Sequence, residues 1–407
     1  MPKLLQISII VNSGSTGRIA EQIGDAAMAS GWDSYIAYGR GAGKSSSKTI
    51  KIGSKIGVYL HALLTRITDR HGLYSRFATR KLIRKISAIN PDIIHLHNIH
   101  GYYLNYKILF EYLRKANIPV VWTLHDCWPM TGHCAYFDSA NCKRWQTGCY
   151  DCPLLGTYPR AKRDNSPYNY KTKRKVFTSL GEKLHLVPVS NWLAEIVQES
   201  FLKESHVSVI HNGINVEAFT PCDGDALCAK YDIAGKRVVL GVALPWSRRK
   251  GLHDFYKLHT LLPRDKYQIV LVGLSQQQIA ELPEGIIAMQ RTHSVEELAQ
   301  WYSLADVFLN ATYEDNYPTT NLEAISCGTP VITYRTGGSP ESVTSHTGRV
   351  VEQGDVESVV KAVKELCAED REAVRDACRE YAEVHFDKKE CFKKYLELYE
   401  KLINKSK

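Results

Sequence analysis

The sequence predicts an α/β protein made of two Rossmann-like, doubly wound domains that face each other across a cleft. At 407 residues the chain is longer than one hydrophobic core usually organises, so two domains are expected. Short β-branched runs alternate with segments of helical period, which is the pattern of parallel strands joined by crossover helices. The hydrophobic fraction of 44% and the charged fraction of 23% are those of a globular protein.

The expected strands fall into two series separated by a turn-rich link. The first series is expected at residues 4–11, 35–38, 92–97, 118–124 and 185–189, and the second at 207–210, 237–243, 267–272, 306–309 and 330–333. Between them Asn212-Gly213 supplies a tight turn, and Pro221 closes an extended link. We therefore expect domains over 1–205 and 206–385, and a helix over 386–407 that packs back on the N-terminal domain.

The chain is expected to be cytoplasmic and not integral to a membrane. The apolar run at 4–11 is too short for a secretory leader, and no apolar stretch approaches the roughly 20 residues of a transmembrane helix. Eleven cysteines in a large chain without a leader favour reduced thiols or a metal over a disulfide framework.

The net charge of +9 is concentrated in one segment. Residues 51–85 hold one acid, Asp69, against the basic residues Lys51, Lys55, Arg66, Arg70, Arg76, Arg80, Lys81, Arg84 and Lys85. Interleaved apolar residues suggest an amphipathic helix pair that rests on the anionic inner face of the plasma membrane, although a solvated helix face would look similar. A second basic cluster over 160–175 favours a membrane or an anionic acceptor, and no aromatic-basic motif supports nucleic acid.

Strand ends in the N-terminal half carry candidate site residues. The loop over 12–18 has glycines, including Gly17, that would let the backbone approach a phosphate, although a plain strand-to-helix turn would look the same. His125-Asp126 follow the strand at 118–124, at the carboxyl end where doubly wound sheets bind ligands. His97 and His100 end another strand, and each has the alternative of being a buried histidine that packs a loop.

The C-terminal half holds the most specific motifs. Asp315 and Glu323 are separated by seven residues that include Tyr317, Pro318, Thr319 and Thr320. Ser-Cys-Gly-Thr-Pro-Val at 326–331 and Thr-Gly-Gly-Ser-Pro-Glu at 336–341 follow, while His-Asn-Gly-Ile-Asn at 211–215 and Arg-Lys-Gly at 249–251 precede. One pair of acids alone would be expected only to cap or solvate a helix.

In combination these motifs resemble the GT-B glycosyltransferases of family 4, also called glycosyl transferases group 1, and above all the bacterial polysaccharide and colanic-acid type enzymes. The two spaced acids resemble the E-x7-E signature, residues 211–215 the hinge, and residues 249–251 the K-G phosphate motif. The resemblance covers essentially the full length. It implies an acceptor-binding N-terminal domain, a donor-binding C-terminal domain and a retaining hexosyltransferase. That enzyme would move a sugar from a UDP- or GDP-sugar to a saccharide or lipid-linked saccharide in surface polysaccharide biosynthesis.

Roles follow for the matched residues. A diphosphate leaving group gains charge as the glycosidic bond breaks, and fixed cations such as Lys250 and Arg249 stabilise that charge. The resemblance implies that Glu323 holds the donor ribose and that Asp315 holds the transferred sugar. The N–H groups of residues 317–320 would meet a donor oxygen at a positive helix end. The resemblance further implies that His125 and Gly17 contact the donor and that the acceptor side is formed by His97, His100 and Asp126. It also implies a front-face attack that needs no metal.

Two positions depart from the family pattern. The first acid is Asp315 rather than Glu, with Glu314 beside it, so either carboxylate is a candidate. Pro245 stands where the family usually has Arg, so Arg248 or Arg249 would have to replace that residue. The alternatives to a transferase are a sugar-nucleotide epimerase of the same fold and a catalytically silent protein that binds zinc and membranes.

A cysteine-rich loop over 127–152 follows His125. Its thiols are Cys127, Cys134, Cys142, Cys149 and Cys152. We predict a structural zinc held by Cys134, Cys142, Cys149 and Cys152, because four thiolates suit tetrahedral zinc and the last two form a close pair. The alternative is a set of free buried thiols.

Overall fold

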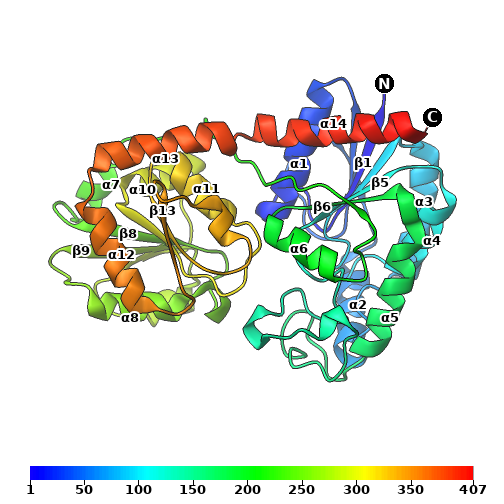
Figure 1. Cartoon of the computed structure of the whole chain (residues 1–407), viewed down its shortest axis with the longest axis horizontal. Coiled ribbons are helices and arrows are strands. Elements are labelled where there is room, and N and C mark those ends of the chain that lie inside the picture. Colours follow the sequence, from blue (N-terminus) through cyan, green and yellow to red (C-terminus); the bar gives the residue numbers. More distant parts are fainter. Residues whose placement is uncertain (407) are drawn as a thin grey trace. The chain divides into compact units, whose positions relative to one another are not determined.

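The computed structural model describes residues 1–406, with the side chain of residue 406 left out, and divides into two compact units (Figure 1). Unit 1 contains residues 1–211 and the residues from 392 onward. Unit 2 contains residues 212–391. Each unit has its own buried sheet, so the prediction of two Rossmann-like α/β domains is confirmed.

Unit 1 is built on seven parallel strands in the order β3-β2-β1-β4-β5-β6-β7. The strands are β1 Lys3–Ser8, β2 Asp33–Tyr38, β3 Lys48–Lys51, β4 Ile93–Leu96, β5 Val120–Leu124, β6 Leu184–Pro188 and β7 His206–Val207. The order reverses between β1 and β4. In doubly wound sheets the loops at the carboxyl ends of two such strands form the ligand site.

The helices of unit 1 connect these strands. They are α1 Gly14–Ala29, α2 Lys55–Thr68, α3 Arg76–Ile89, α4 Tyr106–Lys115, α5 Ser166–Phe177, α6 Asn191–Glu199 and, from residue 392 onward, most of α14 Lys388–Ser406, with the short turns η1 Asp138–Ala140, η2 Arg144–Gln146 and η3 Thr178–Lys183. The side chains of Ser54, Asn105 and Ser190 cap α2, α4 and α6 by accepting a backbone N–H from the first turn. These caps satisfy donors that the helices cannot satisfy themselves.

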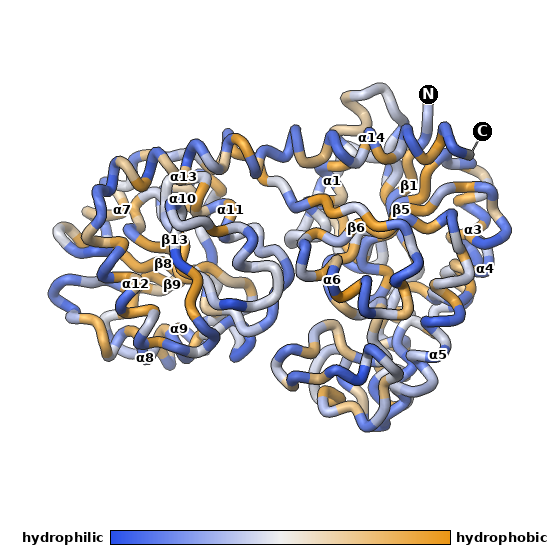
Figure 2. The backbone as a smooth tube through the Cα atoms, in the orientation of Figure 1, coloured by the Kyte–Doolittle hydropathy of each residue, from blue (hydrophilic) through white to orange (hydrophobic). Residues whose placement is uncertain are grey.

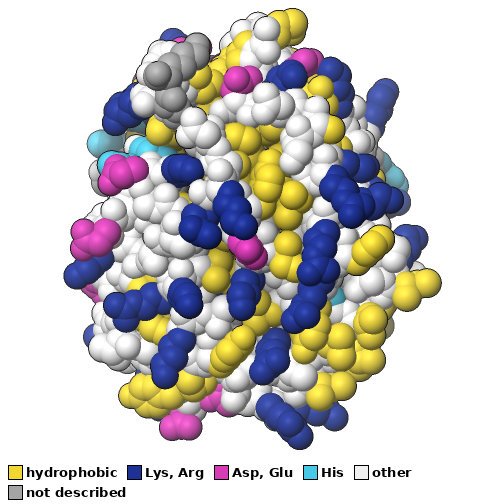
Figure 3. Space-filling view, turned by 90° about the vertical axis from the view of Figure 1, so that its right-hand side faces the viewer, with side chains coloured by type: hydrophobic (Ala, Val, Ile, Leu, Met, Phe, Trp, Pro, Cys, Tyr) yellow, Lys and Arg dark blue, Asp and Glu magenta, His cyan; other side chains and the backbone are white. Residues whose placement is uncertain are grey.

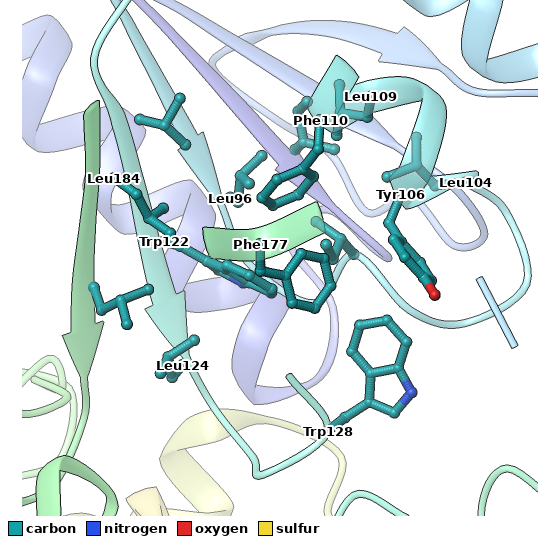
Figure 4. Close-up of a cluster of buried hydrophobic side chains, with 14 of the residues drawn as sticks. Leu96, Leu104, Tyr106, Leu109, Phe110, Trp122, Leu124, Trp128, Phe177 and Leu184 are labelled. Carbon is teal, nitrogen blue, oxygen red and sulfur yellow. The ribbon is translucent and has the colours of Figure 1, made fainter. Parts of the chain in front are cut away.

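A large hydrophobic cluster of unit 1 contains several aromatic side chains, among them Phe110, Trp122 and Phe177 (Figure 4). Trp122 of β5 and Phe177 of α5 meet edge to face, with ring centroids 4.9 Å apart. Apolar strands run through both units, and polar segments lie on their loops (Figure 2). The terminal helix α14 is tied to the sheet of unit 1, because its Tyr399 hydroxyl lies 2.6 Å from Nδ1 of His95.

Unit 2 repeats the arrangement with six parallel strands in the order β10-β9-β8-β11-β12-β13. Its strands are β8 Arg237–Val242, β9 Tyr267–Val272, β10 Ile287–Met289, β11 Val307–Asn310, β12 Val331–Tyr334 and β13 Gly348–Val351. Its helices are α7 Asp225–Lys230, α8 Leu252–Leu261, α9 Gln276–Ala280, α10 Val295–Leu304, α11 Thr319–Ser326, α12 Val356–Ala368 and α13 Arg371–His385, with the turns η4 Arg248–Lys250 and η5 Ser339–Ser342. The strand order reverses between β8 and β11, which places a second switch point there.

Two details of the predicted strand series are wrong. The strand expected at 207–210 does not open the second sheet: β7 pairs with β6 and closes the edge of the first sheet. Unit 1 therefore runs to His211 instead of ending at residue 205. The strands β3, β10 and β13 were not predicted, because short strands at or near a sheet edge lack the long apolar run that marks a central strand.

Candidate active site

The loops that follow β8 and β11 are joined directly to each other in unit 2. Gly251 has a φ of 72°, and a Cβ at this position would overlap the carbonyl oxygen of Ala311. The Tyr313 N–H donates to the carbonyl oxygen of Arg249 at 2.7 Å. A residue with a side chain would be excluded at position 251, because its Cβ would meet backbone and the left-handed φ favours glycine. The close approach brings the Arg-Lys-Gly turn against the loop that carries the spaced acids.

Lys250 and Asp315 form an ion pair at this junction. Nζ of Lys250 lies 2.5 Å from Oδ2 of Asp315, and both side chains are half-buried. Oδ1 of Asp315 accepts the N–H of Asn316 at 2.9 Å. Burial alone would raise the pKa of Asp315, but the Lys250 ammonium and this N–H hold that pKa below its usual value. The Asp315 carboxylate is therefore ionised at neutral pH, and it holds the Lys250 side chain in place.

The neighbouring residues Arg249 and Glu314 are arranged differently. The exposed Arg249 donates from Nη1 to the backbone carbonyl of Glu314 at 2.5 Å. Of the two adjacent acids, Asp315 is the one whose carboxylate contacts Lys250. Arg248 is exposed on the same turn. Asp315 is thus the better placed candidate for the first acid.

Glu323, the second acid, lies on α11 and is 7% exposed. The Tyr302 hydroxyl donates to its Oε2 at 3.0 Å, which fixes the orientation of the carboxylate. Helix α11 begins at Thr319, and its N-cap residue, Pro318, makes no side-chain hydrogen bond to the first turn. Its first N–H groups, with Tyr317 and Thr320 beside them, are therefore suited to an oxygen of a ligand.

Three further contacts hold this region together. Nδ2 of Asn212 donates to the carbonyl of Tyr317 at 3.1 Å, so the hinge motif fixes the start of α11. Asn321 accepts from Asn310 at 2.7 Å and donates to Ser342 at 3.0 Å. The Gly-Gly loop is thereby tied to β11 and α11.

In unit 1, His125 stands at the end of a chain of hydrogen bonds that starts inside the sheet. Nε2 of Gln6 donates to the carbonyl of Ala20 at 2.7 Å, and Oε1 of Gln6 lies 2.9 Å from Nε2 of His97. Nδ1 of His97 lies 3.3 Å from Nε2 of His125. Burial lowers the pKa of His97 well below its usual value and that of His125 to about 4. We therefore assign both rings as neutral, with His125 donating from Nε2.

The side chain of His97 is fully buried and has a partner on both ring nitrogens. The half-buried His125 is the ring that it orients.

His100 and Asp126 form a buried pair. Nε2 of His100 lies 2.9 Å from Oδ2 of Asp126, and Nδ1 of His100 lies 3.0 Å from the Tyr158 hydroxyl. Oδ1 of Asp126 accepts the Trp128 N–H at 3.0 Å. Burial raises the pKa of Asp126, but His100 and the N–H outweigh burial and lower it. The carboxylate is therefore ionised and held in place.

Gly17 lies in the first turns of α1, directly after the loop that follows β1. A Cβ there would meet side-chain and backbone atoms of Ile10 and the backbone nitrogen of Asn12 at 3.0–3.4 Å. The Asn12 N–H donates to the Gly17 carbonyl at 3.0 Å. Glycine therefore allows this loop to lie close against the helix at the switch point of the first sheet.

The zinc prediction is not supported. Cys134, Cys142, Cys149 and Cys152 all line one small cavity, but among residues 1–406 no three His, Cys, Asp or Glu side chains are placed to hold a metal. Burial raises the pKa of Cys149 to about 11 and that of Cys152 to about 12. None of the four thiols is in a disulfide; Cys134 is buried, and Cys142, Cys149 and Cys152 are half-buried.

Lys173 organises the loop instead. Its buried Nζ donates to the carbonyls of Trp128 at 2.6 Å and Thr131 at 3.0 Å, and it lies 3.5 Å from the centroid of the Trp128 ring. Burial lowers the pKa of Lys173 to about 7. Lys173 of α5 therefore holds residues 128–131 of this loop in place.

Sequence reasoning missed Gln6, Tyr302 and Tyr158, which orient the candidate residues. Gln6 had a usable signal, because a polar residue in the middle of a buried strand needs a hydrogen-bond partner. Tyr302 and Tyr158 gave no signal, since their partners are set by tertiary structure.

Comparisons with known proteins agree with this arrangement. The family model described as Glycosyltransferase Family 4 matches residues 16–218, and the one described as Glycosyl transferases group 1 matches residues 236–369. The "Putative colanic acid biosynthesis glycosyl transferase WcaC" of Escherichia coli (strain K12) is 25% identical over 383 residues, which cover 89% of this chain and 90% of that protein.

Two solved structures share the fold. Sucrose-phosphate synthase (tll1590) from Thermosynechococcus elongatus superposes with a TM-score of 0.71 at 17% identity, over 99% of this chain and 100% of that chain. Anabaena Alr3699/HepE in complex with UDP superposes with a TM-score of 0.67 at 14% identity, over 98% and 100%. None of these comparisons supports the epimerase alternative. The chain therefore belongs to the family 4 glycosyltransferases and has the GT-B fold.

Proposed function

We propose that this glycosyltransferase moves a hexose from a UDP- or GDP-sugar to a saccharide acceptor with retention of the anomeric configuration. The observation that carries the proposal is the Lys250–Asp315 pair at the switch point of the second sheet, with Glu323 on the helix that follows. A nucleoside diphosphate needs a fixed cation at its phosphates and an acceptor for its ribose hydroxyls, and these three residues supply both.

The roles follow from the chemistry of each group. Lys250, with Arg249 on the same turn, stabilises the charge that grows on the leaving diphosphate. Asp315 orients Lys250 and accepts hydroxyls of the transferred sugar, while Glu323 accepts the ribose hydroxyls. The N–H groups of the first turn of α11 bind an oxygen of the donor.

The unit 1 residues have supporting roles in the proposal. His125, whose Nε2–H is held by His97, contacts the donor sugar, and Gly17 leaves room for the diphosphate to approach the α1 terminus. His100 and Asp126 shape the acceptor side, and His97 keeps His125 in its tautomer.

The proposed step breaks the bond between C1 of the sugar and the β-phosphate oxygen. The acceptor hydroxyl attacks C1 from the same face, and its proton passes to that phosphate oxygen. The products are a glycoside of unchanged anomeric configuration and a nucleoside diphosphate. Retention rests on the family resemblance of the motifs at 211–215, 249–251 and 315–323.

We further propose that the acceptor is a saccharide of a surface polysaccharide, free or lipid-linked. The full-length similarity to a protein named for colanic acid biosynthesis supports this acceptor class. We propose that the transfer takes place in the cytoplasm.

Product analysis tests the reaction. The purified chain is incubated with UDP-glucose or GDP-mannose and a panel of saccharide acceptors, and nucleoside diphosphate release is measured together with the proton NMR signal of the new anomeric centre. The proposal expects release that depends on an acceptor, and an α-linked product from an α-donor. A β-linked product would exclude retention, and release that ignores every acceptor would point to hydrolysis.

A further inference from the structure

Helix α2 buries two uncharged polar side chains, His61 and Thr65, and exposes most of its large apolar ones. The side chains that face the protein include His61 and Thr65, whereas Ile56 is 80% exposed and Tyr59 is 76% exposed. Leu60, Leu63 and Ile67 continue the exposed stripe at helical spacing. An apolar face of this size is unfavourable in water unless something covers it.

The polar residue on the inner face is built into the fold. Nε2 of His61 accepts the N–H of Gly72 at 3.2 Å, and its Nδ1 lies 2.8 Å from Oγ of Ser75. His61 therefore fixes α2 to the turn that leads into α3. The outward direction of the apolar stripe follows from this anchoring.

A groove between α2 and α3 extends the apolar surface. Its volume is about 460 Å³, within the range of ligand pockets. Leu60 and Leu64 line one side, and Phe77, which is 79% exposed, lines the other. The groove therefore continues the apolar surface of α2 towards α3.

The charges around this face are all of one sign. The nine basic side chains of residues 51–85 are exposed, as the sequence predicted for an amphipathic pair. The segment's single acid, Asp69, points inward: its Oδ1 lies 2.5 Å from Nδ1 of His133, and its Oδ2 accepts the Asn165 N–H at 3.0 Å. Figure 3 shows this end of unit 1, where Lys and Arg side chains predominate beside apolar ones.

We propose that α2, α3 and the groove between them form a docking surface for an anionic phospholipid bilayer. The apolar stripe would enter the acyl region, and the cations would contact the lipid phosphates. Among residues 1–406 no helix is long and apolar enough to span a bilayer, so this contact would be peripheral. A second copy of the chain fits the face poorly, because self-docking would bring the two sets of cations together. The inference is independent of the donor chemistry.

Vesicle binding of the full chain tests the proposal. The vesicles contain phosphatidylcholine alone or with about 30 mol% phosphatidylglycerol. Wild-type protein should co-sediment with the anionic vesicles only, and raising the salt from about 0.05 to 0.5 M should release it. The variant Tyr59→Ser/Leu63→Ser, and separately Arg80→Gln/Lys81→Gln/Arg84→Gln, should each weaken binding at least about tenfold.

Matched controls lie in unit 2. Val384→Ser removes an apolar side chain that is 71% exposed, and Lys257→Gln/Lys266→Gln/Lys364→Gln removes three exposed cations. Both controls should bind vesicles like wild type, and all variants should keep the thermal shift given by a nucleotide sugar. Failure of wild-type protein to bind anionic vesicles would overturn the proposal, as would full binding by the α2 variant Tyr59→Ser/Leu63→Ser and the α3 variant Arg80→Gln/Lys81→Gln/Arg84→Gln. The proposal would also be overturned if wild-type protein formed a concentration-dependent dimer and Tyr59→Ser/Leu63→Ser abolished that dimer.

Discussion

Nζ of Lys250 lies 2.5 Å from Oδ2 of Asp315, although 65 positions separate the two residues in sequence. Each residue follows a different strand of the second sheet, β8 or β11, and these strands are neighbours only because the strand order reverses there. The pair therefore exists through the topology of the sheet, and the topology places it where doubly wound folds bind their ligands.

The two adjacent acids should differ in importance. Asp315→Asn removes the partner of Lys250 and should lower kcat/KM by about 100-fold, as the loss of a charge-assisted contact worth roughly 2–3 kcal/mol would. Glu314→Gln is the matched control and should stay within about twofold of wild type. The rate of nucleoside diphosphate release measures both. If Glu314→Gln lowered kcat/KM more than Asp315→Asn did, Glu314 would be the first acid.

Glu323 should matter through its carboxylate and not through its contact with Tyr302. Glu323→Gln should weaken donor binding by at least about tenfold, because a neutral amide binds ribose hydroxyls less strongly than a charged acceptor does. Tyr302→Phe deletes one hydrogen bond to Oε2 but keeps the charge, so it should have a smaller effect. Calorimetric titration with the nucleoside diphosphate compares them, and equal affinities for wild type and Glu323→Gln would remove the ribose role.

Gln6 should control the tautomer of His125 through His97. Gln6→Leu removes the acceptor for Nε2 of His97, so both imidazoles should lose their preferred tautomer. Imidazole ¹⁵N shifts should report His125 as the Nε2–H form in wild type and as a mixture in the variant. Gln268→Leu, at a buried glutamine of β9, is the control for general destabilisation and should leave His125 unchanged. If the ¹⁵N shifts of His125 were the same in wild type and in Gln6→Leu, the proposed hydrogen-bond chain from Gln6 to His125 would be wrong.

Mild acid should destabilise unit 1. Burial lowers the pKa of His61 to about 3 and the pKa values of His125 and His185 to about 4, and it holds His71 and His95 well below the usual value. Below pH 6.5 the unfolded chain binds protons that the folded chain does not, so stability falls as pH falls from 6.5 towards 4. Each such histidine contributes about 1.4 kcal/mol per pH unit in that window. Urea unfolding at pH 7.5 and 5.5 measures the loss, and equal stabilities would contradict it.

The sequence was sufficient for the central strands and for the motifs of unit 2. Strands such as β5 and β9 are buried on both faces, so they appear as continuous apolar runs. The spaced acids and the Lys250 turn could be assigned to one donor site because their residue types and their order are specific in combination. Edge strands could not be found, since the exposed β3 has no apolar run and gains its pairing only from β2.

Other features of the site depend on contacts that no local pattern encodes. Gln6 and His97 are 91 positions apart, and their hydrogen bond satisfies a ring nitrogen of the buried His97. The zinc prediction counted thiols, but Lys173 of a later helix satisfies the carbonyls of the same loop. The spacing of the cysteines does not indicate whether a lysine from another helix binds the carbonyls of their loop.

Donor binding to the full chain tests the central claim most directly. Thermal unfolding is followed with UDP-, GDP-, ADP- and dTDP-sugars, since a ligand that binds only the folded state adds about 2.7 kcal/mol at 100 times its dissociation constant. We predict a clear rise in Tm with one nucleotide series. The exposed-lysine control Lys257→Ala should keep this rise, and Lys250→Ala should lose it. If no nucleotide sugar raised the Tm of wild-type protein, the chain would be a catalytically silent member of its family. If Lys250→Ala kept the full shift, the donor site would lie elsewhere.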